Sequence, residues 1–235
     1  MSRTWRARGA IGVAAAAMMA PLAGCGDGAE VGLASEPALA ERPAEGVDES
    51  VWMALAGEPR FHLLAARGAL EEHRLEDAAS HLKAVGGVMR LEATRALGAH
   101  ERQRMEGAAL AIAEARRQAQ EGELTPEELA RVTARGLLAV AEHHRDLAVA
   151  AFRAHRPALG GIHTAETARS LKQAYAAADL DIDRVLAADL EAAEVAAERV
   201  QRDGSEAASS RADSTLVPLG HQAIRLENAL GARRR

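Results

Sequence analysis

The chain has 235 residues, with 29 Lys and Arg against 34 Asp and Glu, so its formal net charge at pH 7 is −5. Its aromatic residues are few (two Trp, one Tyr and two Phe), and no basic stripe with interleaved aromatics appears, which argues against a nucleic-acid-binding protein. A single cysteine excludes an internal disulfide, whatever the redox state of the compartment.

Residues 1–24 have the pattern of a secretory signal peptide. Arg3, Arg6 and Arg8 form a basic start, and the run that follows, from residue 9 to residue 20, contains no charge. That run is too short to span a bilayer as a helix. The segment is therefore predicted to direct export and to be removed.

The signal segment ends in Leu22-Ala23-Gly24-Cys25, which resembles the lipobox of bacterial lipoproteins. The resemblance implies that the Cys25 thiol is joined to a diacylglyceryl group, that a peptidase cuts just before it, and that the new amino terminus receives a third acyl chain. Several buried acyl chains give stable anchoring. Gly26 stands where an aspartate would suggest inner-membrane retention, so the resemblance implies an outer-membrane anchor that faces the periplasm.

The mature chain is expected to begin with a tether. Removing residues 1–24 takes away three arginines, so the formal charge becomes −5 − 3 = −8. Residues 25–50 are mainly small and acidic, with two prolines and no apolar period. Such a composition predicts a flexible linker that holds the folded part away from the membrane.

Residues 51–202 are predicted to form one all-α domain. Alanine accounts for 57 of the 235 residues, and no stretch alternates apolar and polar residues with a period of two. The helices are therefore expected to pack closely through small side chains.

In chain order, the first helix is predicted at 51–73 and a long second helix at 76–120, where Gly86, Gly87 and Gly98 could bend it. Thr125 and Pro126 predict the start of a third helix at 126–154. Pro157 opens the fourth, which extends to about 201 and includes the acidic run 179–183, expected to be a solvated face. Residues 203–235 are predicted to be a linker and a short fifth helix with a basic end.

A shift of 82 residues superimposes two histidine patterns. It pairs His62 with His144, His73 with His155, and His81 with His163. The match predicts an internal duplication of a helical hairpin. The resulting fold is an up-down-up-down four-helix bundle, with its two halves related by a pseudo-two-fold along the bundle axis.

The duplicated histidines allow three interpretations. His144 and His155 lie on one apolar face of the third helix and are expected to point to the core. His62 and His144 could face each other and ligate a b-type haem. His73, His81, His155 and His163 could instead gather at a common loop end around zinc, copper or nickel. In the third interpretation they are neutral histidines at the edge of the core, which bind nothing.

No catalytic motif for zinc proteases, di-iron carboxylate bundles, covalent haem, phosphate loops or serine hydrolases is present. We therefore expect a non-enzymatic, lipid-anchored periplasmic bundle that requires no cofactor and either binds an envelope protein partner or stabilises the envelope. The alternative is a bundle that binds haem or a transition metal through the duplicated histidines.

Overall fold

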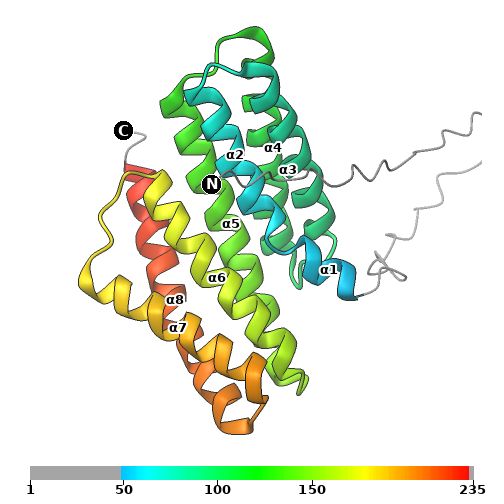
Figure 1. The fold of residues 1–235 in the computed structure, drawn as a ribbon, viewed down its shortest axis with the longest axis vertical. Coiled ribbons are helices and arrows are strands. Elements are labelled where there is room, and N and C mark those ends of the chain that lie inside the picture. Colours follow the sequence, from blue (N-terminus) through cyan, green and yellow to red (C-terminus); the bar gives the residue numbers. More distant parts are fainter. Residues whose placement is uncertain (1–48, 233–235) are drawn as a thin grey trace, which may run out of the picture. The chain divides into compact units, whose positions relative to one another are not determined.

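The computed structural model describes residues 49–232. The predicted signal peptide, Cys25 and nearly all of the expected tether lie outside these residues. Among the described residues the chain is all-helical, as predicted, and forms a helical bundle (Figure 1). Its elements are α1 (Glu49–Leu55), α2 (Glu58–Glu71), α3 (Leu75–Ala93), α4 (Ala99–Glu121), α5 (Pro126–Arg153), α6 (Pro157–Ala177), α7 (Arg184–Asp203) and α8 (Glu206–Ala232).

The described part contains eight helices rather than four and a short fifth, because three predicted helices are interrupted. The first breaks ahead of Pro59, which occupies the opening turn of α2. The second breaks at residues 94–98, where Gly98 is extended and precedes α4, while Gly86 and Gly87 stay helical. The bend predicted at Gly98 is thus a complete break.

The third interruption falls in the acidic run 179–183, which was expected to be helical and is a loop. Asp179 has a positive φ of 51°. The Asp183 side chain accepts a hydrogen bond from the backbone N–H of Leu186 at 2.8 Å and caps α7. Short acidic side chains satisfy free N–H groups at a helix start better than they fit a helix interior.

The predicted linker after residue 203 is also wrong, because α8 starts at Glu206 and extends to Ala232. Gly204, in the left-handed region with φ 59°, ends α7, and the Ser205 hydroxyl accepts from the N–H of Ala208. Ala208 and Ala212 are buried against Ala196 and Val200 of α7. Burial of these small residues outweighs the loop preference of the Ser and Asp residues around them.

The start of α5 is confirmed. Gly122 ends α4 in the left-handed conformation, and the Thr125 hydroxyl accepts from the N–H of Glu128 while the Glu128 carboxylate accepts from the N–H of Thr125. This capping box satisfies two otherwise free donors.

The α2–α3 and α5–α6 turns have the same geometry. His73 and His155 both have positive φ, 59° and 55°. The backbone N–H of each donates to the carbonyl three residues earlier, and the next N–H donates to the carbonyl five residues earlier. The helices that follow begin at Leu75 and Pro157, and 157 − 75 = 82.

The two hairpins are oriented differently from the prediction. Ala56 lies against His144, and Leu63 lies against Gly136, so α2 and α5 run antiparallel. Figure 1 shows the α2–α3 turn at the upper end of the bundle and the α5–α6 turn at the lower end. The axis that relates the hairpins therefore crosses the bundle instead of running along it, and the two turns do not share an end.

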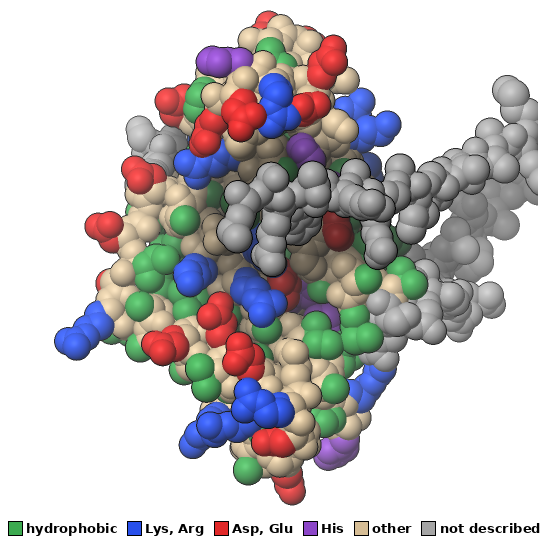
Figure 2. All heavy atoms as spheres, viewed as in Figure 1, with side chains coloured by type: hydrophobic (Ala, Val, Ile, Leu, Met, Phe, Trp, Pro, Cys, Tyr) green, Lys and Arg blue, Asp and Glu red, His purple; other side chains and the backbone are tan. Residues whose placement is uncertain are grey.

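On the face shown in Figure 2, the described side chains of Lys and Arg alternate with those of Asp and Glu and with apolar ones. Such mixing is usual for a protein surface in contact with water. Within residues 49–232, no helix is both long and apolar enough to cross a membrane.

Candidate functional site

Four of the six duplicated histidines form two side-chain pairs. The Nδ1 atoms of His62 and His81 lie 3.0 Å apart, and so do those of His144 and His163. The first pair joins α2 to α3, and the second joins α5 to α6. The two pairs differ in their surroundings: His144 and His163 are each 1 % exposed, whereas His62 and His81 are only partly buried.

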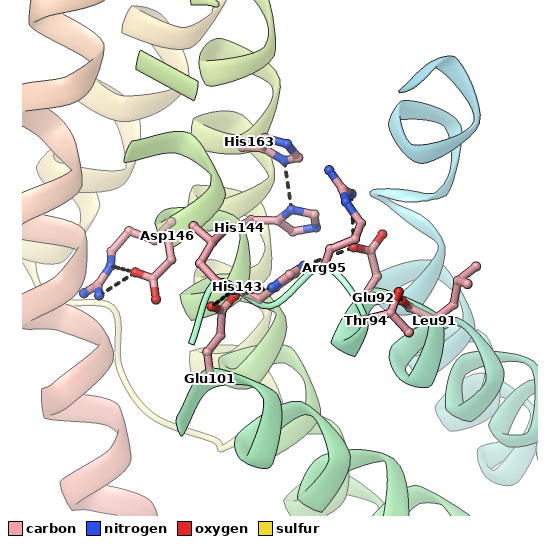
Figure 3. A network of polar contacts seen from close by, with 11 residues as sticks. Leu91, Glu92, Thr94, Arg95, Glu101, His143, His144, Asp146 and His163 are labelled. Atoms are coloured by element: carbon pink, nitrogen blue, oxygen red, sulfur yellow. Dashed lines mark hydrogen bonds and ion pairs between the residues drawn. The ribbon is translucent and has the colours of Figure 1, made fainter. Parts of the chain in front are cut away.

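The buried pair has a definite hydrogen-bond order. The Nε2 of His144 lies 3.3 Å from the carbonyl oxygen of Ala56, which can only accept, so Nε2 carries a proton. In neutral His144, Nδ1 is then an acceptor, and His163 donates to it through Nδ1–H. The Nε2 of His163 is consequently left with a lone pair, and it is buried without a hydrogen-bond partner. Figure 3 shows the two rings one above the other, with centroids 5.1 Å apart and planes 22° apart.

Both buried rings stay neutral at physiological pH. Burial lowers the pKa of His144 to about 3, and the neighbouring His143 cation acts in the same direction. Burial also lowers the pKa of His163 to about 2, with further contributions from His144 and Arg95. A second proton on either ring would be placed in a site without an acceptor or would break the bond between them.

The partly buried pair is open to water and has a carboxylate beside it. The Nε2 of His62 lies 3.3 Å from Oε2 of Glu58, one helical turn earlier. Phe61, 59 % exposed, packs edge-on against His62 and His81 with centroid distances of 5.2 and 6.4 Å. Partial burial lowers the pKa of His62, His81 adds to this effect and Glu58 opposes it.

A fifth histidine, His143, forms a buried network that the sequence did not reveal. Its Nδ1 lies 2.5 Å from Oε1 of Glu101, and its Nε2 lies 3.0 Å from Oε2 of Glu92 (Figure 3). Both carboxylates accept, so both ring nitrogens donate and the ring is a cation. Arg95 pairs with Glu92 at 3.2 Å and stacks over the ring of Trp52 at 4.5 Å.

The charges of this network balance: Arg95 and His143 are positive, and Glu92 and Glu101 are negative. Burial opposes charge on His143, but the hydrogen bonds and charges of Glu101 and Glu92 outweigh it and raise its pKa. Burial likewise opposes charge on Glu92, but the hydrogen bond from His143 and the nearby cations lower its pKa overall. The network ties α3, α4 and α5 together at the α3–α4 break, where Glu101 also accepts from the N–H of Leu97 at 2.7 Å.

His143 is not part of the duplicated pattern, so the pattern did not predict its role. Its equivalent in the first hairpin is residue 143 − 82 = 61, a phenylalanine. The available signal was the pair of adjacent histidines, since consecutive residues on a buried helix diverge by about 100° and reach different neighbours.

The structure does not bring together the residues of the haem interpretation. His62 pairs with His81, and His144 pairs with His163; no ring contact or hydrogen bond joins His62 to His144 in the described chain. Both ring nitrogens of each of these two histidines already have a partner. A haem held by two histidines would need both rings to face one iron atom from opposite sides, and each ring instead faces its partner in its own hairpin.

The four-histidine metal site is not assembled either. His73 and His155 are exposed in the two turns at opposite ends of the bundle. His155 was expected to point to the core, but α5 ends at Arg153 and His155 lies exposed in the following turn, with a φ of 55°. Among residues 49–232, no group of three or more His, Cys, Asp or Glu is placed to hold a metal ion.

A groove of about 840 Å³ lies between α4, α5 and α8. Three apolar residues that line it are more than half exposed: Leu97 (60 %), Val217 (63 %) and Ile224 (52 %). Charged side chains surround them, including Arg145, Arg153 and Asp213. Glu101, which is 6 % exposed, also lines the groove, so one carboxylate of the His143 network borders it.

No protein-family model, curated protein or solved structure matches this chain.

Proposed function

We propose that this chain is a lipid-anchored binding protein of the bacterial envelope, attached through Cys25 to the outer membrane and facing the periplasm. The sequence Leu22-Ala23-Gly24-Cys25 after a basic and then an apolar segment carries the anchoring part of the proposal. With the lipid at one end of the predicted tether, the helical bundle is free to meet a partner. The role is binding or structural and not catalytic. The two hairpins, α2–α3 and α5–α6, derive from duplication of one ancestral hairpin.

The binding surface is the groove between α4, α5 and α8. Exposed apolar residues at its centre and charged residues around them resemble the layout of protein interfaces, where an apolar core is bordered by a polar rim. Leu97, Val217 and Ile224 supply the apolar core. The partner is an envelope protein that presents an apolar segment to this groove.

Replacing Cys25 with serine is expected to abolish acylation, because a hydroxyl does not replace the thiol as the acyl acceptor. The chain should move from the membrane to the soluble fraction and lose incorporation of labelled fatty acid. Ser35→Ala, in the expected tether, is the matched control and should remain in the membrane. A Cys25→Ser chain that stays membrane-bound and acylated would refute the anchor.

Replacing Ile224 with glutamate places a charge at the apolar centre of the groove and is expected to reduce partner crosslinking in intact cells at least tenfold. A charge buried without a counterion at an interface opposes binding strongly. Leu110→Glu is the matched control, because Leu110 is 72 % exposed on α4 but does not line the groove. Equal loss of crosslinked products in both variants, or in neither, would count against the groove.

A further inference from the structure

We propose that His62 and His81 form a binding site for a divalent transition-metal ion, copper(II) in preference to zinc. The Nδ1 atoms of the two imidazoles lie 3.0 Å apart, at hydrogen-bond distance, and a metal ion would replace the proton between them. Metal–imidazole bonds are about 2.0–2.1 Å long, so two nitrogens 3.0 Å apart would subtend an angle of about 95° at an ion bound to both. This inference concerns the bundle itself and does not rest on the lipid anchor or on the groove.

Bound at this nitrogen separation, an ion would meet its two ligands at an angle that favours copper(II) over zinc. Two ligands at about 95° suit adjacent positions of the tetragonal sites that copper(II) and nickel(II) prefer. A tetrahedral zinc ion would need the two nitrogens about 3.3 Å apart. Copper(II) also stands highest in the affinity order of divalent first-row ions.

The surroundings of His62 fit a metal ligand. A ligating histidine usually donates its other ring N–H to a carboxylate or a carbonyl, which fixes the tautomer and makes the ligand more basic. Glu58 provides this carboxylate, with Oε2 3.3 Å from Nε2 of His62. With its proton on Nε2, His62 has the Nδ1 lone pair directed at His81.

His81 can adopt the same tautomer at low cost. In the absence of metal its Nδ1–H donates to His62. When a metal displaces this proton, Nε2 must carry one instead, and the partly buried ring of His81 can donate it to water. Water can also fill the remaining coordination positions, because the pair is open to solvent.

The buried pair has the same nitrogen separation but fails this requirement. A metal on Nδ1 of His163 would force the proton onto Nε2, which is buried with no partner. That pair also leaves no exposed side for water ligands, since both residues are 1 % exposed. The duplicated pattern has therefore given one pair that binds metal and one that only holds helices together.

The test uses the full chain, purified without a histidine tag and titrated with copper(II). Calorimetry should give one site per chain, and electron paramagnetic resonance should show hyperfine coupling to two nitrogens. Zinc should bind at least tenfold more weakly. His62→Gln and His81→Gln should each weaken copper binding at least thirtyfold, and Glu58→Gln should weaken it about tenfold.

Two substitutions provide matched controls. His73→Asn removes an exposed imidazole from the same hairpin, and asparagine tolerates its positive φ. His163→Gln removes the equivalent of His81 in the second hairpin. Both should leave copper affinity unchanged. Unchanged binding in His81→Gln, or a resonance signal in the unsubstituted chain without two-nitrogen coupling, would overturn the proposal; the second result needs no variant to fold.

Discussion

Replacing His143 with alanine should reduce the free energy of unfolding by about 3–5 kcal/mol, the usual cost of removing one partner from a buried ion pair. The substitution leaves Glu92 and Glu101 buried without the cation that both of them contact. Only Arg95 then remains to pair with Glu92. Urea unfolding followed by circular dichroism at pH 7 measures the change.

Two further variants separate the charge effect from the loss of packing. Adding Glu92→Gln and Glu101→Gln to His143→Ala removes the uncompensated charges, so the triple variant should be more stable than His143→Ala alone. His100→Ala, which removes an exposed histidine of α4, should change stability by less than about 0.5 kcal/mol. If His143→Ala lowers the free energy of unfolding by less than about 1 kcal/mol, the network does not stabilise the packing of α3, α4 and α5 at the α3–α4 break.

Acid should destabilise the protein well before its carboxylates titrate. His144 and His163 have depressed pKa values of about 3 and about 2, while unfolded histidine titrates near 6.5. As the pH falls below 6.5, the unfolded chain takes up two protons that the native state does not. Stability should therefore fall by up to about 2.7 kcal/mol per pH unit, which corresponds to two protons at about 1.36 kcal/mol each.

His143 acts in the opposite sense, on the other side of pH 6.5. Its pKa is raised in the native state, so its contribution is fully present below pH 6.5 and is lost as the pH rises through its native pKa. The two effects together predict maximal stability near pH 6.5.

Unfolding in urea at intervals from pH 5 to pH 8 tests this profile. The His163→Gln variant retains a neutral amide in the buried site and lacks one of the two groups, so its slope on the acid side should be about half that of the unsubstituted chain. His155→Asn, which removes an exposed histidine, should keep the full slope. A flat profile between pH 5 and pH 6.5 would contradict neutral burial of the pair.

The sequence predicted the helical class and the strongest boundary. The helical class follows from alanine content and apolar periodicity, which are averaged over many residues. The start of α5 follows from the Thr125 cap, which involves only neighbouring residues. Neither prediction requires tertiary information. The break at Ala56 also involves a distant partner. The carbonyl of Ala56 accepts from His144, 88 residues away, and no local pattern contains that contact.

The histidine pattern was detected, but its pairing was wrong because the relative orientation of the hairpins is a tertiary property. With an axis along the bundle, the two turns and their histidines would lie at one end. The antiparallel packing of α2 on α5, with Leu63 close to Gly136, places them at opposite ends. The pairs inside each hairpin join histidines 19 residues apart on its two helices. The position of the turn alone is enough to predict that such residues lie opposite each other.

His144 and His163 are buried as neutral rings with fixed tautomers. Imidazole nitrogen and proton NMR of the uniformly labelled chain between pH 5 and pH 8 measures these protonation states most directly. His144 should remain neutral with its proton on Nε2, and His163 should remain neutral with its proton on Nδ1, across the whole range. His143 should be a cation with both nitrogens protonated at pH 6.5. Titration of His144 or His163 near pH 6.5, or a proton on Nε2 of neutral His163, would contradict the account.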